Sequence, residues 1–184
     1  MTDNDAVPAD DTRTEHPPRS RRSRALLATA ITLAVAGPAA GVYFGWQNHH
    51  ARELEQARGA AREAACAYGA LLANYASTDL DSYFSAVLAG ATGEWKKEFE
   101  ASSTDLREVL AQGQVRSTSG DVHCAIATSG AADAEAIVVI DQSVASVGTQ
   151  SQPRRGQLSI TLSLTKSGDR WLAGKVSSPL LRTS

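Results

Sequence analysis

Few residues of this chain have the types and spacing that catalysis requires. Asp141 directly follows the apolar run 137–140 and is the best candidate for a cavity acid, although a solvated carboxylate at a strand end is the simpler interpretation. Asp79 and Asp81 stand at an expected helix start, where carboxylates cap the helix and complement its dipole. No Walker loop, dinucleotide fingerprint, G-x-S-x-G or H-E-x-x-H motif occurs. The sequence therefore predicts a protein that is not an enzyme and has no cofactor.

The chain has two cysteines, Cys66 and Cys124. Two cysteines in an exported domain most simply form one disulfide. The alternative is that both remain as buried, unreactive thiols. A zinc site needs histidines at ligand spacing, and neither His123 nor the pair at 49–50 supplies it. We expect a disulfide between Cys66 and Cys124 and no metal site.

Two adjacent cations, Arg154 and Arg155, lie in a polar segment, 146–156, that reads as a loop. A pair of exposed arginines can contact an acidic partner or a lipid head group. The formal net charge of the whole chain is −2, so no overall basic character points to nucleic acid. The sequence predicts that Arg154 and Arg155 form a partner contact and that the protein does not bind nucleic acid.

These residues must be positioned by a part of the chain that follows a membrane anchor. The uncharged run 25–46, ALLATAITLAVAGPAAGVYFGW, is long enough to cross a bilayer as a helix. Arginines at 19, 21, 22 and 24 precede it and favour a cytoplasmic N-terminus. A cleaved signal peptide is the alternative, because Ala34-Val35-Ala36 fits a cleavage site. We expect a disordered cytoplasmic tail over 1–24, a single transmembrane helix over 25–46 and an extracytoplasmic domain beyond it.

The outer domain divides into a helical half, 47–113, and a β-meander half, 114–184. Apolar residues at steps of three and four predict a long helix over 52–76, packed on the protein's own sheet in preference to a coiled coil. Its seam consists of Leu54, Ala57, Ala61, Ala64, Tyr68, Leu71 and Tyr75. Cys66 lies on the opposite face, so a disulfide there requires the helix to be covered on both sides. Two further helices should follow, the second of them interrupted near 102–103.

After Gly113 the apolar period changes to two, which predicts four antiparallel strands. The run 137–140 suggests a strand that is covered on both faces. In the next strand the leucines and isoleucine at 158, 160, 162 and 164 alternate with serine and threonine, so Leu162 should face the core and Thr161 should not. The expected fold is α+β, with helices packed on a curved antiparallel four-strand sheet.

The stretch 74–103, NYASTDLDSYFSAVLAGATGEWKKEFEASS, resembles the Mce-associated membrane proteins of actinobacteria. The matching residues are Tyr75, Leu80, Asp81, Thr92, Gly93 and Trp95, and the likeness extends over 19–178. The resemblance implies an NTF2-like cone and a non-enzymatic, membrane-anchored accessory subunit of an Mce-type complex, which transports lipids or sterols in the cell envelope. It also implies Mce complex proteins as partners, a lipid or sterol as a candidate ligand, and no catalytic residues.

Two other functions share this topology and fold type. One is a VirB8-like assembly subunit of a secretion channel. The other, less favoured, is a steroid-isomerase-like enzyme, which needs a cavity carboxylate opposite a phenol or a protonated acid. A cavity in which Asp141 faces a tyrosine hydroxyl would favour the enzyme, because fold alone cannot establish catalysis.

Overall fold

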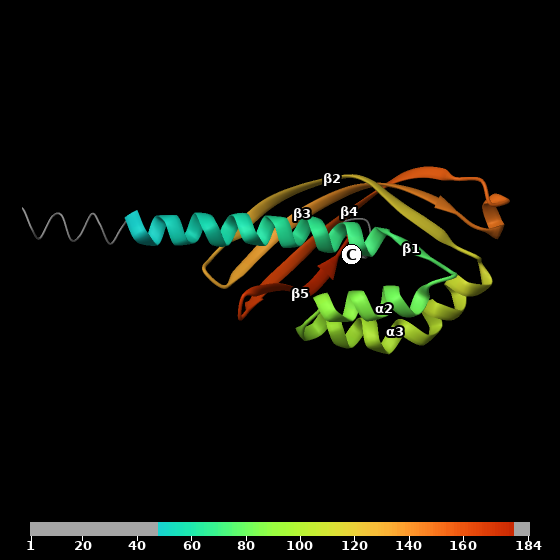
Figure 1. The fold of residues 1–184 in the computed structure, drawn as a ribbon, viewed down its shortest axis with the longest axis horizontal. Helices are drawn as coiled ribbons and strands as arrows, with labels where there is room; N and C mark the ends of the chain where they lie inside the picture. The colour runs from blue at the N-terminus through green and yellow to red at the C-terminus, as the bar shows by residue number, and fades with distance from the viewer. Residues whose placement is uncertain (1–47, 179–184) are drawn as a thin grey trace, which may run out of the picture. The chain divides into compact units, whose positions relative to one another are not determined.

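The computed structural model describes residues 48–178 of the chain. The tail expected over 1–24 and the anchor expected over 25–46 lie outside these residues. Within 48–178, no helix combines the length and the hydropathy that a membrane crossing requires. The described part is α+β, with three helices on a curled antiparallel sheet (Figure 1).

The sheet is a meander whose strand order follows the sequence, β1-β2-β3-β4-β5. Its strands are β1 Tyr75–Ala76, β2 Arg116–Ser129, β3 Asp133–Ala145, β4 Arg154–Ser167 and β5 Arg170–Ser177. The prediction of four meander strands is confirmed for β2 to β5. It missed β1, whose two residues pair antiparallel with the start of β2. A two-residue strand carries no period in the sequence, so only its partner reveals it.

The helices are a long helix described over 48–73, α2 Leu80–Gly90 and α3 Gly93–Gln112. The long helix ends before the predicted limit of 76, because Tyr75 and Ala76 pair with β2 and the Ser117 hydroxyl donates to the carbonyl of Ala73 at 2.7 Å. The predicted break near 102–103 is wrong. Both serines, Ser102 and Ser103, lie inside α3, where their hydroxyls find acceptors in carbonyls three and four residues earlier.

The core lies between the helices and one face of the sheet. Val138 and Ile140 of β3 and Leu162 of β4 are fully buried there, whereas Thr161 is only partly buried. The strand register predicted around Leu162 is therefore confirmed. The prediction that the run 137–140 is covered on both faces is wrong, because Ile137 keeps 45% of its surface exposed. Four β-favouring residues in a row extend a strand whether one face or both are buried.

The long helix is packed on two sides. On one side Gly69 approaches β3 so closely that an added Cβ would lie 2.7 Å from Val138 Cγ1. On the other side the Tyr68 hydroxyl donates to the Val87 carbonyl of α2 at 3.0 Å and accepts from Trp95 Nε1 of α3 at 2.7 Å. The helix is therefore covered on both sides, as a disulfide at Cys66 requires. The prediction that Leu54 belongs to the buried face of this helix is wrong, because 46% of its surface is exposed.

Candidate functional site

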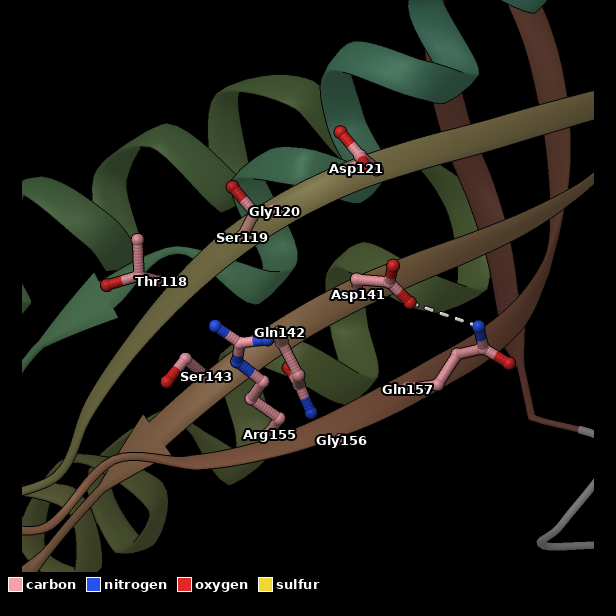
Figure 2. Close-up of a pocket in the computed structure, with 10 residues that line it drawn as sticks. All are labelled: Thr118, Ser119, Gly120, Asp121, Asp141, Gln142, Ser143, Arg155, Gly156 and Gln157. Carbon is pink, nitrogen blue, oxygen red and sulfur yellow. Dashed lines mark hydrogen bonds between the residues drawn. The ribbon is translucent and has the colours of Figure 1, made fainter.

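Three neighbouring strands form an open polar groove of about 650 Å³, close to the turn between β3 and β4. It is lined by residues 118–121 of β2, 141–143 of β3 and 155–157 of β4 (Figure 2). A register shift in β2 between Ser119 and Val122 places Gly120 and Asp121 in a bulge at this point. Bulges commonly bend a strand and re-aim its side chains. The groove therefore follows from an irregularity that strict alternation does not predict.

The strand register brings the polar side chains of the groove together. Thr118 of β2 pairs with Ser143 of β3, and Ser143 pairs with Arg155 of β4. Two residues along, Asp141 pairs with Gln157, whose Nε2 donates to Asp141 Oδ1 at 3.0 Å (Figure 2). Because side chains alternate along a strand, these residues share the sheet face opposite to that of the buried Ile140. The helices leave this face uncovered within the described part of the chain.

Asp141, the candidate cavity acid, is exposed and hydrogen-bonded to an amide. The tyrosines that an isomerase would need lie on the other face of the sheet, among the helices. Tyr83 donates to the Leu72 carbonyl at 3.2 Å and packs its ring against Tyr75 and Phe84. Among the described residues, the structure therefore does not bring Asp141 and a tyrosine hydroxyl into one cavity.

The buried phenols hold the helices together. Burial raises the pKa of Tyr68 to about 12, and the hydrogen bond from Trp95 offsets part of that rise. Burial also raises the pKa of Tyr83 and Tyr75. At neutral pH these groups stay protonated, and Tyr68 and Tyr83 each donate a hydrogen bond to a backbone carbonyl.

Arg154 and Arg155 are exposed, but they do not lie in a loop as predicted. They open β4 and pair with Val144 and Ser143 of β3. The turn before them is shorter than expected because β4 already begins at Arg154, and it contains a 3-10 helix, η1 Val147–Thr149. Among residues 48–178, neither arginine forms an ion pair. Their predicted role as a partner contact stays a prediction.

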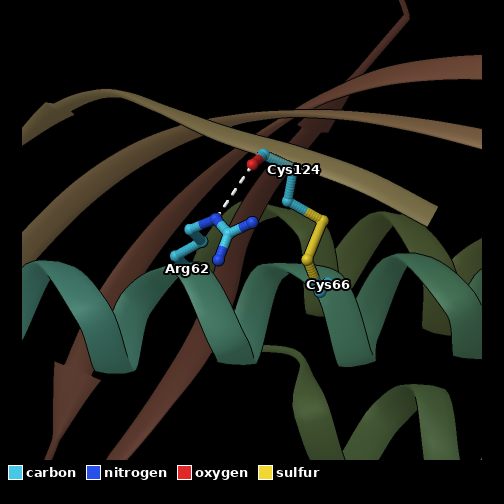
Figure 3. The surroundings of a disulfide bond; sticks show 3 residues. All are labelled: Arg62, Cys66 and Cys124. Atoms are coloured by element: carbon cyan, nitrogen blue, oxygen red, sulfur yellow. Dashed lines mark hydrogen bonds between the residues drawn. A yellow bond between two sulfur atoms is a disulfide. The ribbon is translucent and has the colours of Figure 1, made fainter.

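The predicted disulfide between Cys66 and Cys124 is confirmed (Figure 3). It joins the long helix to β2 across a Cα–Cα distance of 5.7 Å. One turn earlier on the same helix face, Arg62 Nε donates to the Cys124 carbonyl at 3.0 Å. The covalent bond and the hydrogen bond together fix the helix on the sheet at one strand position.

The remaining site predictions concern metal ligands. His123 is exposed on β2, away from other candidate ligands. In the described part of the chain, no three side chains of His, Cys, Asp or Glu come together as ligands. The groove residues Thr118, Gly120 and Gln157 were missed by the sequence analysis. The one available signal was the loss of alternation at Gly120 and Asp121.

Comparisons with known proteins place most of the chain in one family. Residues 23–177 match the family described as "Uncharacterized protein Rv1363c/MT1408-like". The "Uncharacterized protein Rv1363c" of Mycobacterium tuberculosis (strain ATCC 25618 / H37Rv) is 28% identical over 162 residues, which cover 85% of this chain. The match covers 59% of that relative's length.

A solved structure, the intermembrane space region of chloroplast protein ARC6, is 13% identical. The match has a TM-score of 0.38 and covers 52% of this chain and 76% of that one. A TM-score this low supports no argument about fold or function. Neither the family description nor the relative's name states a function or mentions Mce proteins. The chain belongs to the Rv1363c/MT1408-like family.

Proposed function

We propose that this protein is a membrane-anchored, non-enzymatic accessory subunit of an Mce-type lipid or sterol transport complex, with its folded domain outside the cell membrane. The disulfide between Cys66 and Cys124 is the observation that carries the proposal. Thiols stay reduced in the cytosol, so a bond that joins helix to sheet favours export of the domain. The arginines before the uncharged run 25–46 favour the same orientation.

The NTF2-like cone belongs to this proposal. A curled antiparallel sheet with its helices on one face is the arrangement that such a cone requires. The resemblance of 74–103 to Mce-associated proteins supports the assignment to a lipid transport complex. Of its matching residues, Trp95 and Tyr75 take part in the helix packing, and Asp81 forms an ion pair with Arg107 of α3. Several of the residues that carry the resemblance therefore stabilise the fold of the domain.

Binding rather than catalysis is proposed because of where the polar groups lie. Asp141 and the described tyrosines, Tyr68, Tyr75 and Tyr83, occupy opposite faces of the sheet, so they do not form the carboxylate and phenol pair of an isomerase. The exposed groups on β4, Arg154 and Arg155, have no ion-pair partner within 48–178 and can meet an acidic surface. A membrane tether raises the effective concentration of such a surface for membrane-bound partners.

The experiment that tests this proposal is affinity purification of the full chain from membranes in mild detergent. Mce complex proteins should co-purify, and Arg154→Glu combined with Arg155→Glu should reduce their recovery without lowering the thermal stability of the domain. Recovery of secretion-channel proteins instead would favour the VirB8-like function. A topology reporter fused after Ser184 should be active only outside the cell membrane. A mature protein that begins at Gly37 would contradict the retained anchor.

A second experiment separates binding from catalysis. Asp141→Asn keeps the shape of the side chain and removes its charge. We expect lipid uptake by cells to stay essentially intact in this variant, as in the matched control Asp121→Asn in the same groove. Loss of uptake in Asp141→Asn alone, with normal folding and complex assembly, would replace the non-enzymatic proposal with a catalytic or ligand-gating one.

A further inference from the structure

We infer that the first half of β4 is a docking edge for an extended, acidic segment of a partner protein, which adds to the sheet as a further strand. The inference deepens the proposed accessory function and rests on it only for the identity of the partner. In this mode of recognition, backbone hydrogen bonds to a sheet edge provide affinity and alternate side chains provide specificity. The edge, its backbone groups and its charges each contribute to the inference.

The edge exists because the last two strands differ in length. β4 has 14 residues and β5 has 8. β5 pairs with β4 only from Thr161 to Ser167, whereas β3 pairs along β4 from Arg154 to Thr165. On the β5 side, the segment 154–160 therefore has no strand partner within residues 48–178. Unpaired edge groups of this kind are a template for another strand.

The orientation of the backbone groups on this edge follows from one hydrogen bond. The Ser178 hydroxyl donates to the Ser159 carbonyl at 3.2 Å, so that carbonyl points to the β5 side. In an antiparallel ladder, the N–H and C=O of one residue point the same way and alternate residues share that direction. The N–H and C=O groups of Gln157 and Arg155 therefore also point to the open edge. The groups of the residues between them bond to β3.

The charges next to this edge favour an acidic strand. Arg154 and Arg155 are both exposed on the edge strand itself. Neither arginine forms an ion pair within residues 48–178. A carboxylate directly opposite Arg155 on an added strand would lie about 5 Å from it in Cβ distance. Such a pair is favourable, and like charges at the same position would repel.

The nearest acid on this face does not cancel that preference. Asp141 lies on β3, on the far side of β4 from the open edge, and Gln157 donates a hydrogen bond to it. At about 4.8 Å per strand, an added strand lies roughly 10 Å from β3, which is about one Debye length at 0.1 M salt. The adjacent arginines therefore dominate. A second copy of this chain would bring its own two arginines to the edge, so like charge disfavours self-pairing.

The test measures binding of a labelled peptide to the full chain in mild detergent by fluorescence anisotropy. The probe is an end-blocked seven-residue peptide that alternates glutamate and valine, and its control replaces glutamate with lysine. The glutamate peptide should bind at least about tenfold more tightly than the lysine peptide, and Arg154→Glu with Arg155→Glu should reverse this preference. Equal binding of the two peptides would overturn the acidic character of the partner.

Backbone pairing is tested separately from charge. Gln157→Pro removes an N–H from the open edge, where proline is tolerated in a sheet, whereas Gln157→Ala removes only the side chain. Binding should fall at least about tenfold in the proline variant and change less than about threefold in the alanine variant. Because the proline variant can also perturb the strand, glutamate peptides with N-methyl groups on odd or on even residues provide an independent measurement. Only alternate N–H groups of the peptide would face β4, so methylation of one half of the residues should abolish binding and methylation of the other half should not.

Three outcomes would overturn the inference. Equal binding of the two N-methylated peptides would exclude strand addition. Binding that occurs only after residues 179–184 are removed would assign the edge to the chain's own C-terminal segment. Dimerisation that competes with the peptide would assign it to a second copy. Recovery of Mce proteins alongside a failed peptide test would reject only this inference, whereas peptide binding without Mce recovery would reject the proposed function.

Discussion

A close approach between the long helix and the sheet, at Gly69, predicts opposite effects for one substitution at two positions. In Gly69→Ala the new Cβ would lie 2.7 Å from Val138 Cγ1 and 3.4 Å from Ile140 Cδ1. Ordinary carbon contacts are about 3.5–4.0 Å, so the helix or the valine must move by about 1 Å. Val138 is fully buried in the middle of the sheet, which leaves it little room to move. In Gly59→Ala, earlier on the same helix, the new Cβ meets nothing within 4 Å.

The magnitudes follow from two terms. Replacing a helical glycine with alanine stabilises a helix by about 0.5–1 kcal/mol, and this gain applies at both positions. Overpacking of a core costs about 1–3 kcal/mol, and this cost applies only at Gly69. The free energy of unfolding should therefore rise by about 0.5–1 kcal/mol in Gly59→Ala and fall by on the order of 1 kcal/mol in Gly69→Ala. The two variants should differ by about 2 kcal/mol, or roughly 8 °C in Tm for a domain of this size.

Thermal unfolding of the oxidised full chain in detergent, followed by circular dichroism, provides the measurement. A double-mutant cycle with Val138→Ala identifies the contact, because removing Cγ1 should make the added methyl at Gly69 less costly. If Gly69→Ala raised Tm as much as Gly59→Ala, the helix would not press on β3 and the packing described here would be wrong.

Three further predictions concern the core, the disulfide and the buried phenols. Leu162→Ala should lower the free energy of unfolding by roughly 2–5 kcal/mol and Thr161→Ala by less than about 1 kcal/mol; equal shifts in Tm would contradict the strand register. Replacing Cys66 and Cys124 with serine should cost up to about 4 kcal/mol in the chain-entropy model, and alkylation of both thiols without prior reduction would contradict the bond. Because the pKa of Tyr68 rises from 10.0 to about 12 on folding, the unfolded chain ionises first, so stability should fall as pH rises from about 10 towards 12. Tyr68→Phe should flatten this loss, and an unchanged pH dependence of Tm would refute the assignment.

The meander was the most predictable part of the fold. A buried face on a half-exposed strand must repeat every two residues, so the alternation from 158 to 164 was enough to place Leu162 in the core. The disulfide was predictable for a different reason, since two cysteines allow one intramolecular pairing. The exposure of Ile137 was not predictable, because an apolar run does not state which face the helices will cover.

The candidate site was predicted only in part. Arg154 and Arg155 were identified by charge, but their position in a strand depends on pairing with β3. Asp141 was identified by its place after an apolar run, yet its separation from the tyrosines depends on which face of β3 is buried. The groove itself depends on a bulge in β2 and on register across three strands. Such features arise between segments far apart in the chain, and no local spacing records them.

The sequence by itself determined the helical and β halves of the fold, the strand that carries Leu162, the single partner available to each cysteine and the family to which the chain belongs. Each of these follows from local periodicity, from a count of residues or from similarity along the chain. Within residues 48–178, the tertiary structure alone decided that the long helix is packed on two sides. It also decided that Asp141 and the described tyrosines lie on opposite faces of the sheet. Finally, it left half of β4 with an open edge within the same residues. These outcomes depend on the relative lengths of paired strands and on contacts between remote side chains, which are set only when hydrophobic burial brings the elements together.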